Sequence, residues 1–217
     1  MSQEQTKSAR ERIADKQKKY ATGGGFFKLE DDGDYAVIRF LHSDADDIDA
    51  HCLPAHVVEV DNKERKVACL QTADCPLCLA GNKPALKLCL YVVRVDEKNN
   101  SFGETPELWE RGSTFIGKIL GLIDEYGELI NRNYKVVRNG KKGSTKTTYE
   151  FYAKDPDTDP EATYDELPER PELVGGFILN WSAEDMNEYL GISNKPAAPV
   201  NRGGGNQTGG RKGRLPF

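Results

Sequence analysis

The chain has 217 residues, of which 37% are hydrophobic and 30% charged, and its formal net charge is −5. No apolar run reaches the ~20 residues of a membrane-spanning helix, and the first twenty residues lack the apolar centre of a secretory signal peptide. We therefore expect a cytoplasmic protein with one main domain and no membrane contact. The five cysteines are an odd number and mostly clustered, which favours a reducing compartment over a disulfide scaffold.

The mildly acidic total conceals a strong asymmetry. Residues 1–20 hold six Lys and Arg against three acids, and residues 131–154 hold seven against Glu150 alone. The acids gather in residues 155–172, where eight stand against Arg170. Because salt screens charges beyond a Debye length of about 8 Å, local potential decides partners, and a polyanionic ligand is compatible with this composition.

The predicted elements begin with a basic helix over Ser8–Tyr20 and a Gly-rich hinge over Ala21–Gly25. Residues 35–41 are predicted as a strand, and residues 86–95 form the strongest apolar run. A helical spacing follows over Phe115–Tyr126, with Gly127 as its end. The remaining predicted elements are strands over Val57–Val60, Lys66–Leu70, Tyr134–Arg138, Thr147–Ala153 and Gly176–Trp181, and a brief helix over Ala183–Leu190.

Three cysteines and one histidine provide the most specific motif, His56-x12-Cys69-x5-Cys75-Pro76-Leu77-Cys78. Thiolates and imidazole in this number suit a tetrahedral zinc ion, and the full set leaves no position for a catalytic water. If Asn62 and Lys63 form the hairpin turn, His56 faces Cys69 across the strand pair at roughly 5 Å. We therefore predict one structural Zn2+.

Two alternatives stand beside this metal site. The cysteines could be ordinary buried thiols, and Cys52 is a weaker substitute ligand. Cys89 lies within the long apolar strand and is expected to be a core thiol.

Five to seven short strands, one or two helices and a metal-stapled insertion fit a mainly β (α+β) fold. We expect a five-stranded open barrel of the oligonucleotide-binding type, with a β-sandwich as the alternative. The predicted organisation is a basic N-terminal segment over 1–25, a core over 26–194 with a zinc subdomain at about 51–85, and a disordered basic tail over 195–217.

Aromatic and cationic residues interleave along the predicted strands, as in proteins that stack bases and hold phosphates of single strands. The alternative for each aromatic side chain is a place in the core. The candidate nucleic-acid-binding residues are Arg39, Phe40, Tyr91, Arg94, Trp109, Arg111, Lys118, Tyr134, Lys135, Arg138, Lys141, Lys142, Lys146, Tyr149 and Phe151.

The strand Tyr35–Leu41, the four predicted ligands and the run Val92-Val93-Arg94-Val95 resemble the T-even phage helix-destabilising protein family. The resemblance covers roughly residues 26–154. It implies an oligonucleotide-binding fold with a zinc subdomain, and cooperative, largely sequence-independent coating of single-stranded DNA. Phage DNA replication, recombination and repair in the cytoplasm of a bacterial host would be its setting.

Both termini bear on partners. Lys7 and Arg10 resemble the family's N-terminal segment that bridges neighbouring protomers, so we expect self-association. The family's acidic tail is replaced here by a basic, Gly-rich one, which ends in Leu215-Pro216-Phe217. That tip is similar to the one with which bacterial single-strand-binding proteins dock replication partners, although there it follows aspartates.

The sequence also bears on two other function classes, a protein-interaction adaptor and an enzyme. A zinc-stapled adaptor of a replication or transcription complex is the alternative to strand binding. An enzyme is not expected, because the chain has no Gly-rich phosphate loop, Ser/His/Asp set or metal-spaced carboxylate cluster. The aspartates at 44, 46, 47 and 49 lack the Gly and closing Glu of a calcium loop, so we expect a solvated loop there.

Overall fold

The computed structural model describes residues 25–99, 101–144, 146–159, 163 and 166–192. The expected N-terminal helix, the protomer contacts Lys7 and Arg10, and the basic tail over 195–217 lie outside these residues. Within them, no helix combines the length and apolar character needed to cross a bilayer.

Eight strands make one antiparallel sheet, which is open because its strand path does not close on itself. The path runs β3-β2-β4-β1-β7-β8, and β5 and β6 also pair with β4. The strands are β1 (Tyr35–Phe40), β2 (Cys52–Val60), β3 (Lys63–Ala68), β4 (Ala85–Asp96), β5 (Ser101–Phe102), β6 (Glu107–Gly112), β7 (Arg132–Asn139) and β8 (Thr148–Pro156).

The described helices are short and lie between or after the strands. They are α2 (Ala45–Ala50), α3 (Pro76–Leu79), α4 (Ile116–Tyr126) and α6 (Ala183–Tyr189), with 3-10 turns at Ser113–Phe115 and Leu129–Asn131. The predictions of β1, β4, α4, β7, β8 and α6 are confirmed within a few residues, and Gly127 ends α4 at a φ of 77°.

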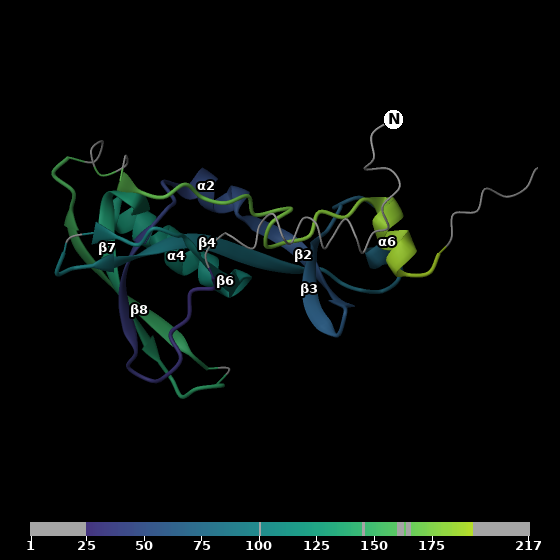
Figure 1. Ribbon diagram of the computed structural model, residues 1–217, viewed down its shortest axis with the longest axis horizontal. Coiled ribbons are helices and arrows are strands. Elements are labelled where there is room, and N and C mark those ends of the chain that lie inside the picture. Colours follow the sequence, from purple (N-terminus) through teal and green to yellow (C-terminus); the bar gives the residue numbers. More distant parts are fainter. Residues whose placement is uncertain (1–24, 100, 145, 160–162, 164–165, 193–217) are drawn as a thin grey trace, which may run out of the picture.

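The long strand β4 organises the molecule. One edge of it pairs with β6, from Lys87 to Val92, so β1 and β2 must share the other edge. β2 takes the first half, with Cys52 opposite Leu88, and β1 takes the second half, with Phe40 opposite Val92. β4 therefore runs between the two ends of an elongated molecule, a larger lobe that also includes β1, β6, β7, β8 and α4, and a smaller lobe formed by β2, β3 and α6 (Figure 1).

Side-chain alternation separates the two faces of the strands in the larger lobe. Ile38, Phe40, Leu90 and Trp109 point into one core cluster, to which α4 and β8 add their apolar residues. The outward side chain of Tyr91 packs in a second cluster with Leu173 and Ile178, near the C-terminal end of the described chain. This second face of β4 is therefore covered too, as a continuous apolar run in a strand requires.

Residues 166–181 form that cover, and we call them the strap. Figure 1 shows the strap running along the sheet from the larger lobe to α6. Leu179 exchanges backbone hydrogen bonds with β3, accepting from Ala68 N at 3.0 Å and donating to Lys66 O at 2.8 Å. The predicted strand over Gly176–Trp181 is therefore wrong in form, since only isolated bridges at Val174, Ile178 and Leu179 appear there.

The first residues of the described chain lie along the free edge of β6. Phe27 N donates to Leu108 O at 3.0 Å, and Leu108 N donates to Gly25 O at 3.0 Å.

The prediction of a solvated aspartate loop is also corrected, because residues 45–50 form α2. Asp44 caps this helix by accepting a hydrogen bond from Asp47 N at 3.0 Å.

Candidate metal centre

The hairpin of β2 and β3 carries the first ligand candidate, His56. Its two-residue turn is Asp61-Asn62, with φ values of 53° and 58°, as a type I′ turn requires. The predicted turn at Asn62-Lys63 is therefore wrong by one residue, and His56 faces Val67 rather than Cys69. Because the pairing shifts by two residues, the side chain of His56 stays on the predicted face.

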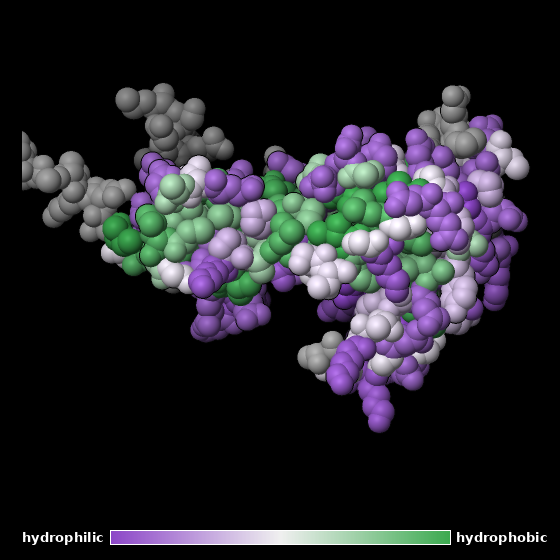
Figure 2. All heavy atoms as spheres, turned by 180° about the vertical axis from the view of Figure 1, so that it is seen from behind, coloured by the Kyte–Doolittle hydropathy of each residue, from purple (hydrophilic) through white to green (hydrophobic). Residues whose placement is uncertain are grey.

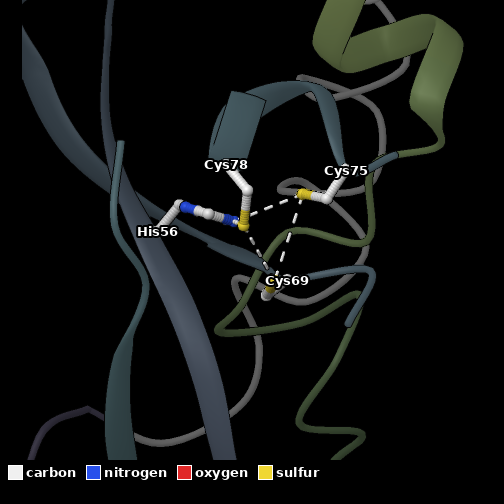
Figure 3. A group of neighbouring side chains, drawn as sticks. All are labelled: His56, Cys69, Cys75 and Cys78. Atoms are coloured by element: carbon white, nitrogen blue, oxygen red, sulfur yellow. Dashed lines mark hydrogen bonds between the residues drawn. The ribbon is translucent and has the colours of Figure 1, made fainter. Parts of the chain in front are cut away.

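The other three ligand candidates follow β3 within ten residues. Cys69 comes directly after the strand, and its backbone N–H donates to Pro54 O at 2.9 Å. Cys75 precedes α3, in which Pro76 is the first residue and Cys78 completes one turn. Figure 3 shows the three sulfurs and the His56 ring turned toward one another.

The ligand atoms have the spacing of a tetrahedral zinc site. Zn–S bonds of about 2.3 Å and a Zn–N bond of about 2.0 Å imply S···S edges of about 3.8 Å and S···N edges of about 3.5 Å. Cys69 Sγ lies 3.7 Å from Cys78 Sγ and 4.0 Å from Cys75 Sγ. His56 Nε2 lies 3.5 Å and 3.7 Å from the sulfurs of Cys75 and Cys78.

Burial and neighbouring charges shift the pKa values of the thiols in this cluster. Burial opposes ionisation of Cys75, but backbone N–H groups of Cys78 and Leu70, followed by His56, lower its pKa to about 6. Burial and the sulfurs of Cys69 and Cys75 raise the pKa of Cys78 to about 12. Like charges oppose one another here, and a central cation would relieve that opposition.

The surroundings fix the ligand set in place. His56 and Cys75 are fully buried, in an apolar cluster with Trp181 and Met186. Met186 of α6 reaches Cys75, with its sulfur 3.9 Å from the thiol. The lobe thus includes the strap end and α6, beyond the predicted limit at about residue 85. Nε2 is the nitrogen of His56 that faces the sulfurs. Nδ1 has no hydrogen-bond partner among the described residues.

Most of the aromatic residues predicted to stack on bases lie in the core. Phe40, Tyr91, Trp109, Tyr134 and Tyr149 are each 6% exposed or less, so as predicted stacking platforms they are corrected. Phe151 is half-buried and packs against the core of the larger lobe. Hydrophobic clustering explains this outcome, because the faces that carry these rings point into that core or lie under the strap.

The predicted cations divide into structural and exposed groups. Arg39 is 1% exposed and bonds Asp157, and Arg138 is 7% exposed and donates to Tyr149 Oη and Lys141 O. Both are therefore corrected from phosphate contacts to structural residues. Arg111 packs its guanidinium over Trp109, Phe115 and Tyr149. The remaining predicted cations are partly or well exposed: Arg94, Lys118, Lys135, Lys141, Lys142 and Lys146.

A second group of potential ligands, His42, Asp47 and His51, is a structural joint. The Tyr91 N–H donates to His42 Nε2 at 2.8 Å, which leaves the ring proton on Nδ1, 3.3 Å from Asp47 Oδ2. The Arg170 guanidinium of the strap bonds both Asp47 oxygens, at 2.7 and 2.8 Å. Neither nitrogen of His42 therefore offers a lone pair to a metal ion.

This joint should make the protein sensitive to acid. Burial lowers the pKa of His42 to about 4, outweighing the opposite effect of Asp47, while His51 and Arg170 lower it further. Below pH ~6.5 His42 is protonated in the unfolded chain but stays neutral in the folded protein. The free energy of unfolding therefore falls as the pH drops toward 4. The loss is on the order of 3 kcal/mol. Urea unfolding at pH 7 and 4.5 measures it, and His42→Asn should show a smaller loss; an equal loss in both proteins contradicts the assignment.

No family model, curated protein or solved structure matches this chain.

Proposed function

We propose that this protein binds single-stranded DNA without enzymatic activity, through an oligonucleotide-binding barrel whose inserted lobe is held by one zinc ion. The observation that carries the proposal is the strand order β6-β4-β1-β7-β8 with α4 between β6 and β7. Numbered in chain order, with the inserted strands β2 and β3 and the short β5 left out, these strands are the third, second, first, fourth and fifth. An oligonucleotide-binding barrel has this order, and it binds its ligand near strands two and three and the loops after strands one and four.

The two loops named by that rule have unusual content here. The connection after β1 spans residues 41–84 and contains the β2–β3 hairpin and the metal centre. The connection after β7 spans residues 140–147 and carries Lys141, Lys142 and Lys146. Figure 2 shows the hairpin tip and this loop as two hydrophilic projections, with a band of hydrophobic residues between the two ends of the molecule.

A cleft of about 370 Å³ connects these parts. It is lined from β3 by Lys66, from β6 by Arg111, and from β8 by Tyr149, and its last side is residues 26–30. The basic loop joins this last side through an ion pair between Lys142 and Glu30. Lys66 and Lys87 both contact Glu110, which leaves a net positive charge at the hairpin side of the cleft. Such a cationic groove suits a phosphate backbone.

The proposed zinc ion acts on the opposite face of the hairpin. Opposed residues of a strand pair share a face, so His56 and Val67 point one way and Lys66 the other. The ion would therefore fix the orientation of β3 without touching the ligand. The sequence resemblance to the T-even phage family supports the combination of an oligonucleotide-binding fold with a zinc subdomain.

The basic loop provides the test of this function. Replacing Lys141, Lys142 and Lys146 together by alanine should weaken binding to a labelled oligo(dT) by up to about 50-fold at 0.15 M salt. The slope of log K against log salt should become shallower by about 2, from ~0.7 per lost phosphate contact. Fluorescence anisotropy of the labelled strand measures both, and it avoids tryptophan emission, since Trp109 and Trp181 are buried.

Lys98→Ala is the control, because Lys98 is an exposed lysine that belongs neither to the basic loop nor to the cleft lining. This variant should bind as the wild type does. Wild-type protein that binds neither single nor double strands at low salt would remove the proposal and favour the adaptor role.

A further inference from the structure

Phe26 has a surface position that the sequence patterns did not single out. Residues 25–27 follow the edge of β6, so neighbouring side chains point to opposite sides. Phe27 turns inward, is 3% exposed and meets the Trp109 ring at 5.0 Å. Phe26 turns outward and is 48% exposed.

The surroundings of Phe26 orient its ring. Phe177 of the strap meets it edge-on, with ring centroids 5.7 Å apart and an interplanar angle of 75°. This contact holds the ring on one side while nearly half of the side chain remains open. Phe26 also lines the cleft of about 370 Å³, a volume within the ~300–1,000 Å³ typical of small-ligand sites.

The cleft offers one accessible ring and several cations. Its other described aromatic side chains, Phe27, Trp109 and Tyr149, are at most 6% exposed, so none presents a free face. Lys28 lies two residues from Phe26 and hence on the same side of this extended segment. Lys66 lines the cleft from β3, where its ammonium group contacts the Glu110 carboxylate at 2.5 Å and its side chain stays 29% exposed. An open ring beside cations is an arrangement that holds one nucleotide of a single strand.

We propose that Phe26 stacks on one base of the bound strand and that Lys28 and Lys66 hold the adjoining phosphates. This inference rests on the proposed function and assigns its base-stacking position. Stacking on an aromatic ring tolerates every base, because each has a π face. The site therefore requires a base but does not select one.

A cycle between the ring and the base provides the test. The probes are a labelled deoxythymidine oligomer of about 16 nucleotides, the upper end of the usual site size, and an abasic strand of equal length. Wild-type protein should bind the abasic strand more weakly. Phe26→Leu should lose about 5- to 100-fold on the thymidine strand and much less on the abasic strand, since leucine packs against Phe177 but does not stack.

Two further variants make the outcome specific. Phe26→Trp should retain the affinity for the thymidine strand, and its emission should be quenched on binding. Tyr35→Ala removes another exposed ring, outside the cleft lining, and should bind within about twofold of the wild type.

The results separate this inference from the function beneath it. If wild type and Phe26→Leu bind the thymidine strand equally and lose equally on the abasic strand, Phe26 does not stack, and single-strand binding still stands. If the wild type binds neither strand, the proposed function itself fails. A loss in Phe26→Leu that is equal on both strands would also overturn the stacking role.

Discussion

Replacing Cys75 by serine should abolish metal binding and unfold the smaller lobe. The wild-type protein is expected to contain one zinc ion per chain, and the variant none, because three ligands remain and the missing thiolate is the most buried of the three. Loss of a structural metal belongs to the small class of changes that cost more than about 4 kcal/mol. Elemental analysis gives the metal content, and thermal unfolding followed by circular dichroism gives the stability.

Cys52→Ser is the control for this experiment. Cys52 is also a free cysteine and is half-buried, but it pairs with β4 and lies outside the ligand group. It should keep the full metal content. A wild-type protein that carries no metal after purification with zinc present, or a Cys75→Ser protein that retains it, would contradict the metal centre.

Replacing Asp157 by asparagine should destabilise the protein by roughly 3 kcal/mol, because it leaves the Arg39 charge buried without its carboxylate partner. The Arg39 guanidinium bonds both Asp157 oxygens, at 2.5 and 2.9 Å, and its remaining donors go to Asn133 Oδ1 and Ile130 O. Urea unfolding at pH 7 measures the change. Affinity for single strands at temperatures well below the transition should be unchanged, since Arg39 is inaccessible to a ligand.

Two variants delimit this result. Asp155→Asn removes an exposed acid two residues away and should change stability by no more than about 0.5 kcal/mol. Arg39→Met combined with Asp157→Asn should recover much of the loss, because an apolar side chain of similar length has no charge to bury. If Asp157→Asn is as stable as the wild type, the buried pair does not contribute as argued.

The distinction between ligand and core residues follows from these contacts. The sequence places Arg39 and Phe40 side by side on a strand, and that pairing is equally compatible with a ligand face and with a core. Arg39 points away from the core of the larger lobe. It is buried because Asp157 and Phe102 cover it. Phe26, which is available to a ligand, carries no periodic signal because its neighbours form no regular strand.

The sequence by itself determined the four ligand candidates, the strand and helix pattern of the larger lobe, and the basic loop between β7 and β8. Most of these are local properties: a Cys-x2-Cys turn, an alternation of period two, and a Gly/Lys run are each complete within a few residues. The tertiary structure alone decided the hairpin register, the strap and the exposure of each ring. Those features depend on residues far apart in the chain, as when Leu179 pairs with Lys66 and Arg170 reaches Asp47. Which face of a strand meets water is settled by what packs on it, and the sequence of that strand does not contain its cover.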